Sequence, residues 1–224
     1  PLFAVTAAGC LPYDSKLPSL DMLGLNDYYI PRHPPTIKGE RYAGGGPLGH
    51  ELGHGLYVLS RKPDLISFCA PKGSERACYL SGRQMELFED FHVNYTLVNF
   101  LGRDPYEYGA LIWVRKYSEK IGIRQTPYSV EIPAFLMNGN RDTYAYLNDA
   151  KELVISVTKD RYAAVHLPKV PAGQLSLQIK TPHPELLAPE IRRNQDGSVL
   201  VVLSTAGPEE IEIGGLILVS SLAP

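Results

Sequence analysis

Two histidines and a glutamate between residues 50 and 54 form the motif in this chain that comes nearest to a known chemistry. His50, Glu51 and His54 give the pattern HExxH. On a helix, this spacing sets two imidazoles one turn apart, where they can hold zinc, and sets the glutamate beside the metal-bound water. The spacing alone therefore predicts a zinc metallopeptidase.

A zinc site of this kind needs a third ligand, and the sequence does not single one out. Ser60 stands where the metzincin continuation of the motif would place a histidine. Glu86, Glu89 and His92 lie in or beside a segment with helical character and are the remaining candidates. Glu86 with the two histidines makes up the ligand set of the zinc interpretation.

The glycines around the motif argue against a metal-holding helix. Gly49, Gly53 and Gly55 fall in or next to the two turns that such a helix requires, and each costs about 1 kcal/mol relative to alanine in a helix interior. We therefore expect the two histidines to lie in a glycine-rich loop, where they serve hydrogen bonding or ligand contact without a metal or other cofactor. The zinc metallopeptidase, with zinc as its cofactor, is kept as the alternative.

The composition is that of an ordinary globular chain. The 224 residues include 44 % hydrophobic and 21 % charged side chains, with a formal net charge of −2, which argues against a nucleic-acid partner. No run reaches the roughly 18 consecutive apolar residues of a membrane-spanning helix. The chain starts at Pro1 without an initiating methionine or a signal peptide, so we expect it to be cut from a longer protein.

The first half of the chain alternates predicted strands with predicted helices. Short apolar runs predict buried strands at residues 3–9, 20–23, 65–68, 95–100 and 110–115. Helical spacing or capping signals predict short helices at residues 11–16, 27–30, 51–60 and 84–91. This alternation is typical of a small α/β unit with a partly parallel sheet. We assign that unit to residues 1–124.

The second half has no helical period and consists of short β-rich runs between turns. The runs lie at residues 130–132, 143–147, 153–157, 162–167, 175–179, 198–204 and 211–220. Such spacing indicates an antiparallel β-sandwich of the jelly-roll or immunoglobulin-like sort, which we assign to residues 125–224. The chain as a whole is therefore predicted to be an α+β or α/β protein.

Cys69 and Cys78 bracket a polar loop with turn signals. In an oxidising compartment these two thiols would form a disulfide hairpin, whereas in a reducing one they would stay unpaired. The sequence alone leaves both alternatives open.

A longer set of phrases resembles a known family. The phrases are Ala7-Ala8-Gly9, Leu11-Pro12-Tyr13, Asp21-Met22-Leu23-Gly24-Leu25-Asn26-Asp27, Gly49-His50-Glu51, Tyr57-Val58-Leu59, Arg61-Lys62-Pro63-Asp64 and Trp113-Val114-Arg115-Lys116-Tyr117-Ser118. Their order is similar to that in the soluble extracytoplasmic C-terminal region of polytopic bacterial membrane glycosyltransferases, which resemble mannosyltransferases and arabinofuranosyltransferases and use lipid-linked sugars. The resemblance covers about half the chain. Leu52 and Pro31 depart from the residues usual in that family, a lysine and an alanine.

The resemblance implies a protein of the cell envelope, on the periplasmic or outer face. The chain would be tethered to the membrane through a transmembrane region before Pro1. The catalytic carboxylate of such enzymes lies between membrane helices, so this part is expected to be inert alone and to bind a glycan or lipid-linked saccharide. A plain carbohydrate- or protein-binding module is a further alternative.

Carboxylates and tyrosines suit sugar hydroxyls and ring planes, and they gather after a predicted strand end, where ligands tend to bind in open sheets. The candidate ligand-binding residues are Asp21, Asp27, Tyr28, Tyr29, Arg32, His50 and Glu51. Asp21 and Asp27 could instead cap the local turn and helix.

Overall fold

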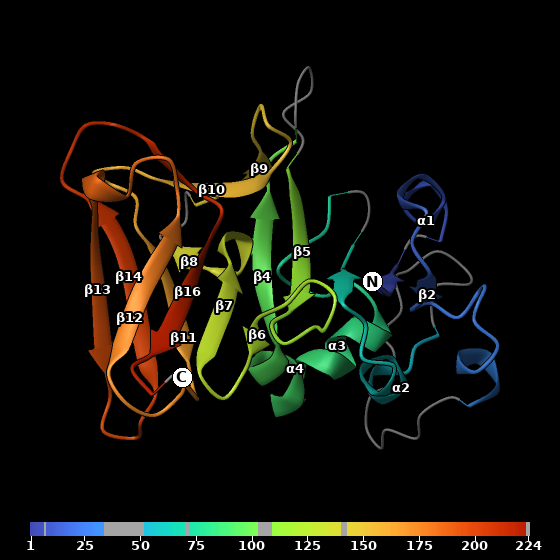
Figure 1. Ribbon diagram of the computed structural model, residues 1–224. Helices are drawn as coiled ribbons and strands as arrows, with labels where there is room; N and C mark the ends of the chain where they lie inside the picture. Colours follow the sequence, from blue (N-terminus) through green and yellow to red (C-terminus); the bar gives the residue numbers. More distant parts are fainter. Residues whose placement is uncertain (7, 34–51, 70–71, 103–108, 140–142, 223–224) are drawn as a thin grey trace. The chain divides into compact units, whose positions relative to one another are not determined.

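The computed structural model describes residues 1–6, 8–33, 52–69, 72–102, 109–139 and 143–222. Contacts divide the chain into two compact units (Figure 1). Unit 1 comprises residues Pro1–Leu97 and Ala110–Lys120, and unit 2 comprises Val98–Gly109 and Ile121–Pro224. The sequence predicts two independently folding domains, 1–124 and 125–224. These two domains stay a prediction, because the units above are defined by contacts alone.

Unit 1 contains four strands that lie side by side in the order β5-β3-β1-β2 at one end of a larger mixed sheet. The strands are β1 (Phe3–Val5), β2 (Ser19–Asp21), β3 (Leu65–Ser67) and β5 (Ala110–Arg115). β1 pairs in parallel with β2 and β3, and β3 pairs antiparallel with β5. The partly parallel sheet expected for this half of the chain is therefore present.

Short helices connect the strands of unit 1. They are α1 (Cys10–Ser15), the 3₁₀ helix η1 (Ile30–Arg32), α2 (Gly55–Ser60), α3 (Leu80–Glu86) and α4 (Glu89–Asn94). The single helix predicted at 84–91 is wrong, because the chain forms α3 and α4 with an extended residue, Phe88, between them. Glu89 and Asp90 favour a new helix start there, since acidic side chains are stabilising in a first turn.

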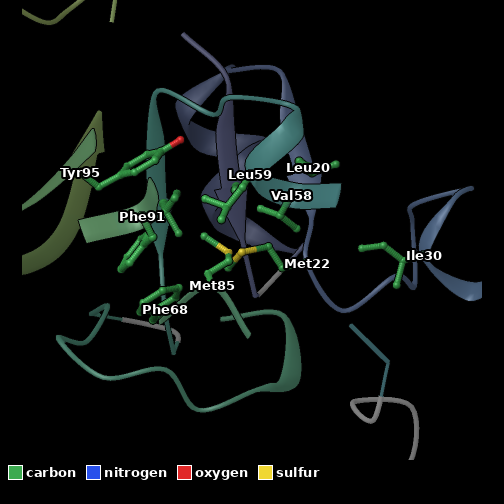
Figure 2. Close-up of a cluster of buried hydrophobic side chains, with 11 residues drawn as sticks. Leu20, Met22, Ile30, Val58, Leu59, Phe68, Met85, Phe91 and Tyr95 are labelled. Atoms are coloured by element: carbon green, nitrogen blue, oxygen red, sulfur yellow. The ribbon is translucent and has the colours of Figure 1, made fainter. Parts of the chain in front are cut away.

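The core of unit 1 lies where the sheet meets α2, α3 and α4 (Figure 2). Met22, Ile30, Val58, Phe68, Met85 and Phe91 are fully buried there. The rings of Phe68 and Phe91 lie 5.8 Å apart at a tilt, and the ring of Phe91 lies 4.8 Å from that of Trp113. α2 joins this core through Val58 and Leu59.

Unit 2 contains two four-stranded antiparallel sheets in a β-sandwich-like arrangement (Figure 1). One sheet has the order β13 (Leu187–Arg193), β14 (Val199–Thr205), β11 (Ala163–Leu167) and β8 (Asn138–Gly139). The other has the order β12 (Leu175–Lys180), β16 (Gly215–Ser220), β7 (Ser129–Pro133) and β6 (Arg124–Gln125). The predicted α+β fold with a sandwich-like part is confirmed.

The remaining elements of unit 2 are β9 (Ala145–Leu147), β10 (Leu153–Val157), β15 (Ile211–Ile213), the 3₁₀ helices η2 (Ala134–Leu136) and η3 (Pro184–Leu186), and the end of β4 (Tyr95–Phe100). β10 pairs antiparallel with β9 and β15. The run predicted as one strand at 211–220 is two strands, because Gly214 separates β15 from β16 and each joins a different sheet. No helix in the described part of the chain is both long and apolar enough to cross a membrane.

Candidate functional site

Asp21 ends β2 and holds the turn that follows it. Its side chain is only 6 % exposed. Oδ1 accepts a hydrogen bond from the Leu23 N–H at 2.9 Å, and Oδ2 accepts one from the Asn26 N–H at 2.7 Å. The carboxylate predicted as a ligand contact is therefore already engaged in the local turn, which was the alternative interpretation of this residue.

Asp27 starts the 3₁₀ turn η1 in the same way. Its Oδ1 accepts hydrogen bonds from the N–H groups of Tyr29 and Ile30, both at 2.8 Å. Its other oxygen, Oδ2, accepts the hydroxyl of Tyr57 at 3.1 Å. Asp27 thus caps η1 and also joins η1 to α2, although thirty residues separate Asp27 from Tyr57 in the chain.

Four rings gather beside this carboxylate and are called the aromatic cluster below: Tyr29, His33, His54 and Tyr57. Tyr29 stacks on His33 with centroids 4.0 Å apart and on Tyr57 with centroids 4.3 Å apart, at interplanar angles of 14° and 16°. His54 lies against the edge of this stack, 5.7 Å from the ring of Tyr29. Offset ring pairs of this kind are mutually stabilising.

Tyr57 is a hydrogen-bond donor in this cluster at neutral pH. Burial and the hydrogen bond to Asp27 raise the pKa of the Tyr57 hydroxyl above its usual value. The phenol therefore keeps its proton, and Asp27 remains the acceptor.

Tyr28 and Arg32 form the exposed margin of the site. Tyr28 is 75 % exposed. The guanidinium carbon of Arg32 lies 3.7 Å from the centroid of its ring, and Nη1 donates to the Tyr28 carbonyl at 3.0 Å. The cation covers one face of the ring, so the ring is held in place while the rest of it remains open to solvent.

His54 stands directly before α2 and acts as its cap. Its Nδ1 accepts the Tyr57 N–H at 3.1 Å, and its own N–H donates to the hydroxyl of Ser81 at 2.8 Å. The helix predicted over 51–60 begins at Gly55, and Leu52 and Gly53 are not helical. The described end of the HExxH motif is therefore extended chain that packs on α3.

The described residues among the other zinc candidates have separate partners. His50 and Glu51 lie outside the described residues. Glu86 accepts the Ala77 N–H at 2.9 Å through Oε1, and the carbonyl of Glu86 lies 2.7 Å from Nε2 of His92. Within the described ranges, no group of three or more His, Cys, Asp or Glu side chains is placed to hold a metal ion. Zinc binding that includes His50 stays a hypothesis.

The predicted Cys69–Cys78 hairpin is present as a disulfide, with Cα atoms 5.7 Å apart. The loop that it closes joins β3 to α3 in unit 1. Gly73, within this loop, forms a bridge to Leu111 of β5. The loop that the disulfide closes therefore contacts β5 through this bridge.

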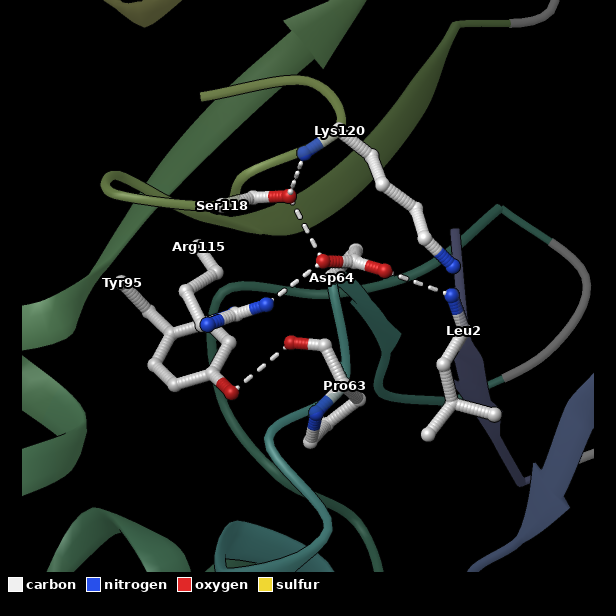
Figure 3. Close-up of polar contacts among 7 residues, drawn as sticks. All are labelled: Leu2, Pro63, Asp64, Tyr95, Arg115, Ser118 and Lys120. Carbon is white, nitrogen blue, oxygen red and sulfur yellow. Dashed lines mark hydrogen bonds and ion pairs between the residues drawn. The ribbon is translucent and has the colours of Figure 1, made fainter. Parts of the chain in front are cut away.

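A polar network around Asp64 was not predicted from the sequence (Figure 3). Asp64 is 3 % exposed. Its Oδ1 accepts hydrogen bonds from Arg115 at 2.7 Å and Ser118 at 2.6 Å, and its Oδ2 accepts the Leu2 N–H at 2.7 Å. Burial raises the pKa of Asp64, but the hydrogen bonds from Ser118, Arg115 and Leu2 together lower it below the usual value. Asp64 and Arg115 both lie in phrases that carry the family resemblance.

Asp27, Tyr28, Tyr29 and Arg32 were predicted as part of one ligand-binding group, and they lie together because all four belong to one short segment. Sequence reasoning did not connect them with Tyr57 and His33, whose rings complete the stack. The helical spacing of α2 was visible in the sequence, but only the fold shows which of its faces meets Tyr29.

These features define a mixed α+β protein with an aromatic and carboxylate site on its N-terminal unit. A family model described as "Domain of unknown function (DUF8728)" matches residues 2–130. The chain belongs to this family, and the matched range contains both the aromatic cluster and the Asp64 network. Comparison with curated proteins and with solved structures gives no match.

Proposed function

We propose that this chain binds a glycan through the aromatic cluster and Tyr28, as the extracytoplasmic part of a membrane glycosyltransferase-like protein. In this role the chain positions an acceptor or a lipid-linked saccharide and carries out no bond chemistry itself. The supporting observation is Tyr28, an exposed ring that Arg32 holds by one face and that directly precedes Tyr29, the middle ring of the stack.

The chemistry of the site favours a sugar over a purely apolar ligand. A tyrosine ring offers an apolar face for the C–H groups of a sugar and a hydroxyl for its polar edge. Arg32 brings several N–H donors to the same place, and donors of this kind pair with sugar oxygens. The two carboxylates are engaged in turns, so we assign them the role of positioning Tyr28, Tyr29 and Tyr57 rather than of contacting the sugar.

Location at the outer face of a membrane is part of the same proposal. The Cys69–Cys78 disulfide supports it, because stable disulfides form mainly in oxidising compartments. The membrane tether and the sugar ligand are part of the proposal because the resemblance to the soluble region of polytopic glycosyltransferases implies them.

The test is binding of mannosyl and arabinofuranosyl oligosaccharides, first on an array and then by calorimetry. Tyr28→Ala should weaken binding of the best ligand by about tenfold or more, which corresponds to the loss of one stacking contact. Tyr13→Ala is the matched control, because Tyr13 is also exposed and also carries a cation, Lys16, over its ring. Equal binding by both variants, or no binding by the unmodified chain, would refute the proposal.

A further inference from the structure

A second hollow in unit 1 lies between α2, α4 and β5, away from the rings of the aromatic cluster. It has a volume of about 470 Å³, which is within the range of small-molecule sites. Its apolar side consists of Leu56, Leu59 and Phe88. Its polar lining is Ser60, Lys62, Asp90, Asn94, Tyr95 and Arg115.

The two cations of this groove have unused hydrogen-bonding capacity. Lys62 is exposed, and its ammonium has no hydrogen-bond or ion-pair partner among the described residues. Arg115 donates from Nη2 to Asp64, whereas its Nε is buried without a partner in the described part of the chain. Buried donors without partners are rare in folded proteins and call for an explanation.

Three other polar side chains of the groove already have partners. The hydroxyl of Tyr95 donates to the carbonyl of Pro63 at 2.9 Å. The side-chain amide of Asn94 donates to both the carbonyl and Oδ1 of Asp90 at 2.9 Å. Lys62 and Arg115 therefore bring two positive charges with free donors against the single carboxylate of Asp90, and a ligand that satisfies these donors must supply acceptor oxygens.

The apolar side of the groove is partly open to solvent. Leu56 is 55 % exposed, whereas Val58 and Leu59 of the same helix are buried. Phe88 is half-buried beside it. A ligand with a short apolar portion would cover these side chains, and each square ångström of apolar surface removed from water contributes about 25 cal/mol.

We propose that this groove binds a small organic anion, a carboxylate or a phosphate monoester, whose head lies at Lys62 and Arg115 and whose apolar part lies on Leu56 and Phe88. Asp90 lies in the same lining and disfavours a second, separate anionic group on the ligand. The proposal does not depend on glycan binding, because it uses none of the rings of the aromatic cluster.

The test uses four probes whose binding to the intact chain is measured by calorimetry and by chemical-shift changes. Octanoate and octyl phosphate carry an anionic head and an apolar tail. Octylammonium has the same tail with the opposite charge, and inorganic phosphate has no tail. We expect the two octyl anions to bind and the other two probes to bind at least about tenfold more weakly. The tighter of the two octyl anions identifies the head group.

Lys62→Gln and Leu56→Ser test the two halves of the groove separately. Each substitution should weaken the binding of the octyl anion by about fivefold to tenfold. Both positions are exposed, so neither change disturbs the core. Lys151→Gln is the matched control. Lys151 is also exposed, and both lysines have a positive φ, 62° at Lys151 and 49° at Lys62.

Three results would overturn the proposal. They are the failure of both octyl anions to bind at millimolar concentration, equal binding of octylammonium, and an equal loss of affinity in Lys151→Gln and Lys62→Gln. A midpoint of urea unfolding equal to that of the unmodified chain shows that the Lys62 and Leu56 variants are folded. Failure of glycan binding at Tyr28 would leave this result unaffected.

Discussion

Nη2 of Arg115 lies 2.7 Å from Oδ1 of Asp64, across 51 residues of chain. Asp64 immediately precedes β3, and Arg115 is the last residue of β5, so this ion pair fastens two neighbouring strands at one end. The Leu2 N–H donates to the same carboxylate and brings in the segment before β1. Three segments of unit 1 therefore depend on one buried side chain.

Replacement of Asp64 by asparagine should lower the free energy of unfolding by about 3 kcal/mol, because Arg115 would be left largely buried without its counter-charge. Urea unfolding followed by circular dichroism measures this change. Glu190→Gln is a control of the opposite kind, since its partner Arg192 is exposed and the pair lies on the surface. We expect no measurable change in the free energy of unfolding of Glu190→Gln. A similar loss in Glu190→Gln and Asp64→Asn would contradict the idea that burial makes the Asp64–Arg115 pair important.

The lowered pKa of Asp64 predicts a dependence of stability on pH. The carboxylate binds a proton more readily in the unfolded chain, whose aspartate pKa is about 3.9, than in the folded chain. Its contribution is therefore fully present above that pH and is lost as the pH falls through the lower folded value. We expect urea titrations between pH 2.5 and 7 to show that the difference in unfolding free energy between the unmodified chain and Asp64→Asn becomes smaller below about pH 4. A difference that grows on acidification would contradict this assignment.

Gly55→Ala should destabilise unit 1 by about 2 kcal/mol, although alanine is the better helix former. A Cβ at Gly55 would lie 2.6 Å from Cβ of Gln84 and 2.7 Å from the carbonyl oxygen of Ser81. The Gly9→Ala variant serves as the comparison, because a Cβ there meets nothing within 4 Å. Thermal unfolding of both variants decides whether the close approach of α2 and α3 outweighs helix propensity.

Removal of the disulfide by the double change Cys69→Ser and Cys78→Ser should cost about 2–3 kcal/mol, the chain-entropy value for so short a loop. The expected signature is a lower unfolding midpoint with unchanged far-ultraviolet circular dichroism. Incubation of the unmodified chain with a reductant should reproduce the shift. If neither treatment changes the midpoint, the bond does not constrain the unfolded chain.

Chelation is expected to leave the protein unchanged. His54 accepts the Tyr57 N–H through Nδ1, and the chain before it is not helical, so the geometry of a zinc-protease helix is missing at residues 52–54. An excess of EDTA should therefore shift neither the unfolding midpoint nor the histidine resonances. Stoichiometric zinc in the purified chain, lost in His50→Ala, would restore the metallopeptidase alternative.

Much of the fold follows from local pattern. Apolar runs located β1, β3, β4 and β5, and short β-rich runs between turns located β10, β11 and β14. The same pattern could not find β13, whose residues after Leu187 are exposed on both faces. An edge strand of this kind is held by its backbone, and its side chains carry no periodic signal.

The sequence predicts the part of the site whose residues are neighbours in the chain, but not the contacts between segments that are far apart in the chain. Asp27, Tyr28, Tyr29 and Arg32 were found because turn-forming carboxylates and tyrosines share a few consecutive residues. The glycines of the HExxH segment were taken as evidence against a metal-holding helix, and in the described part Gly53 is not helical, but the reason for these glycines was not visible in the sequence. A Cβ at Gly53 would lie 2.5 Å from the Ser81 N atom, so these glycines admit α3, a neighbour that sequence spacing does not reveal.

The contact between α2 and α3 has a consequence for motion. Six residues are too few for an isolated helix to persist in water, and the first amide of α2 is held by Gln84 of α3 at 2.6 Å. The two helices should therefore open to solvent together, with their amide protons exchanging for deuterium at a common rate. Since α2 carries Tyr57 on one side and Leu56 on another, each such opening would dismantle both proposed binding surfaces at once.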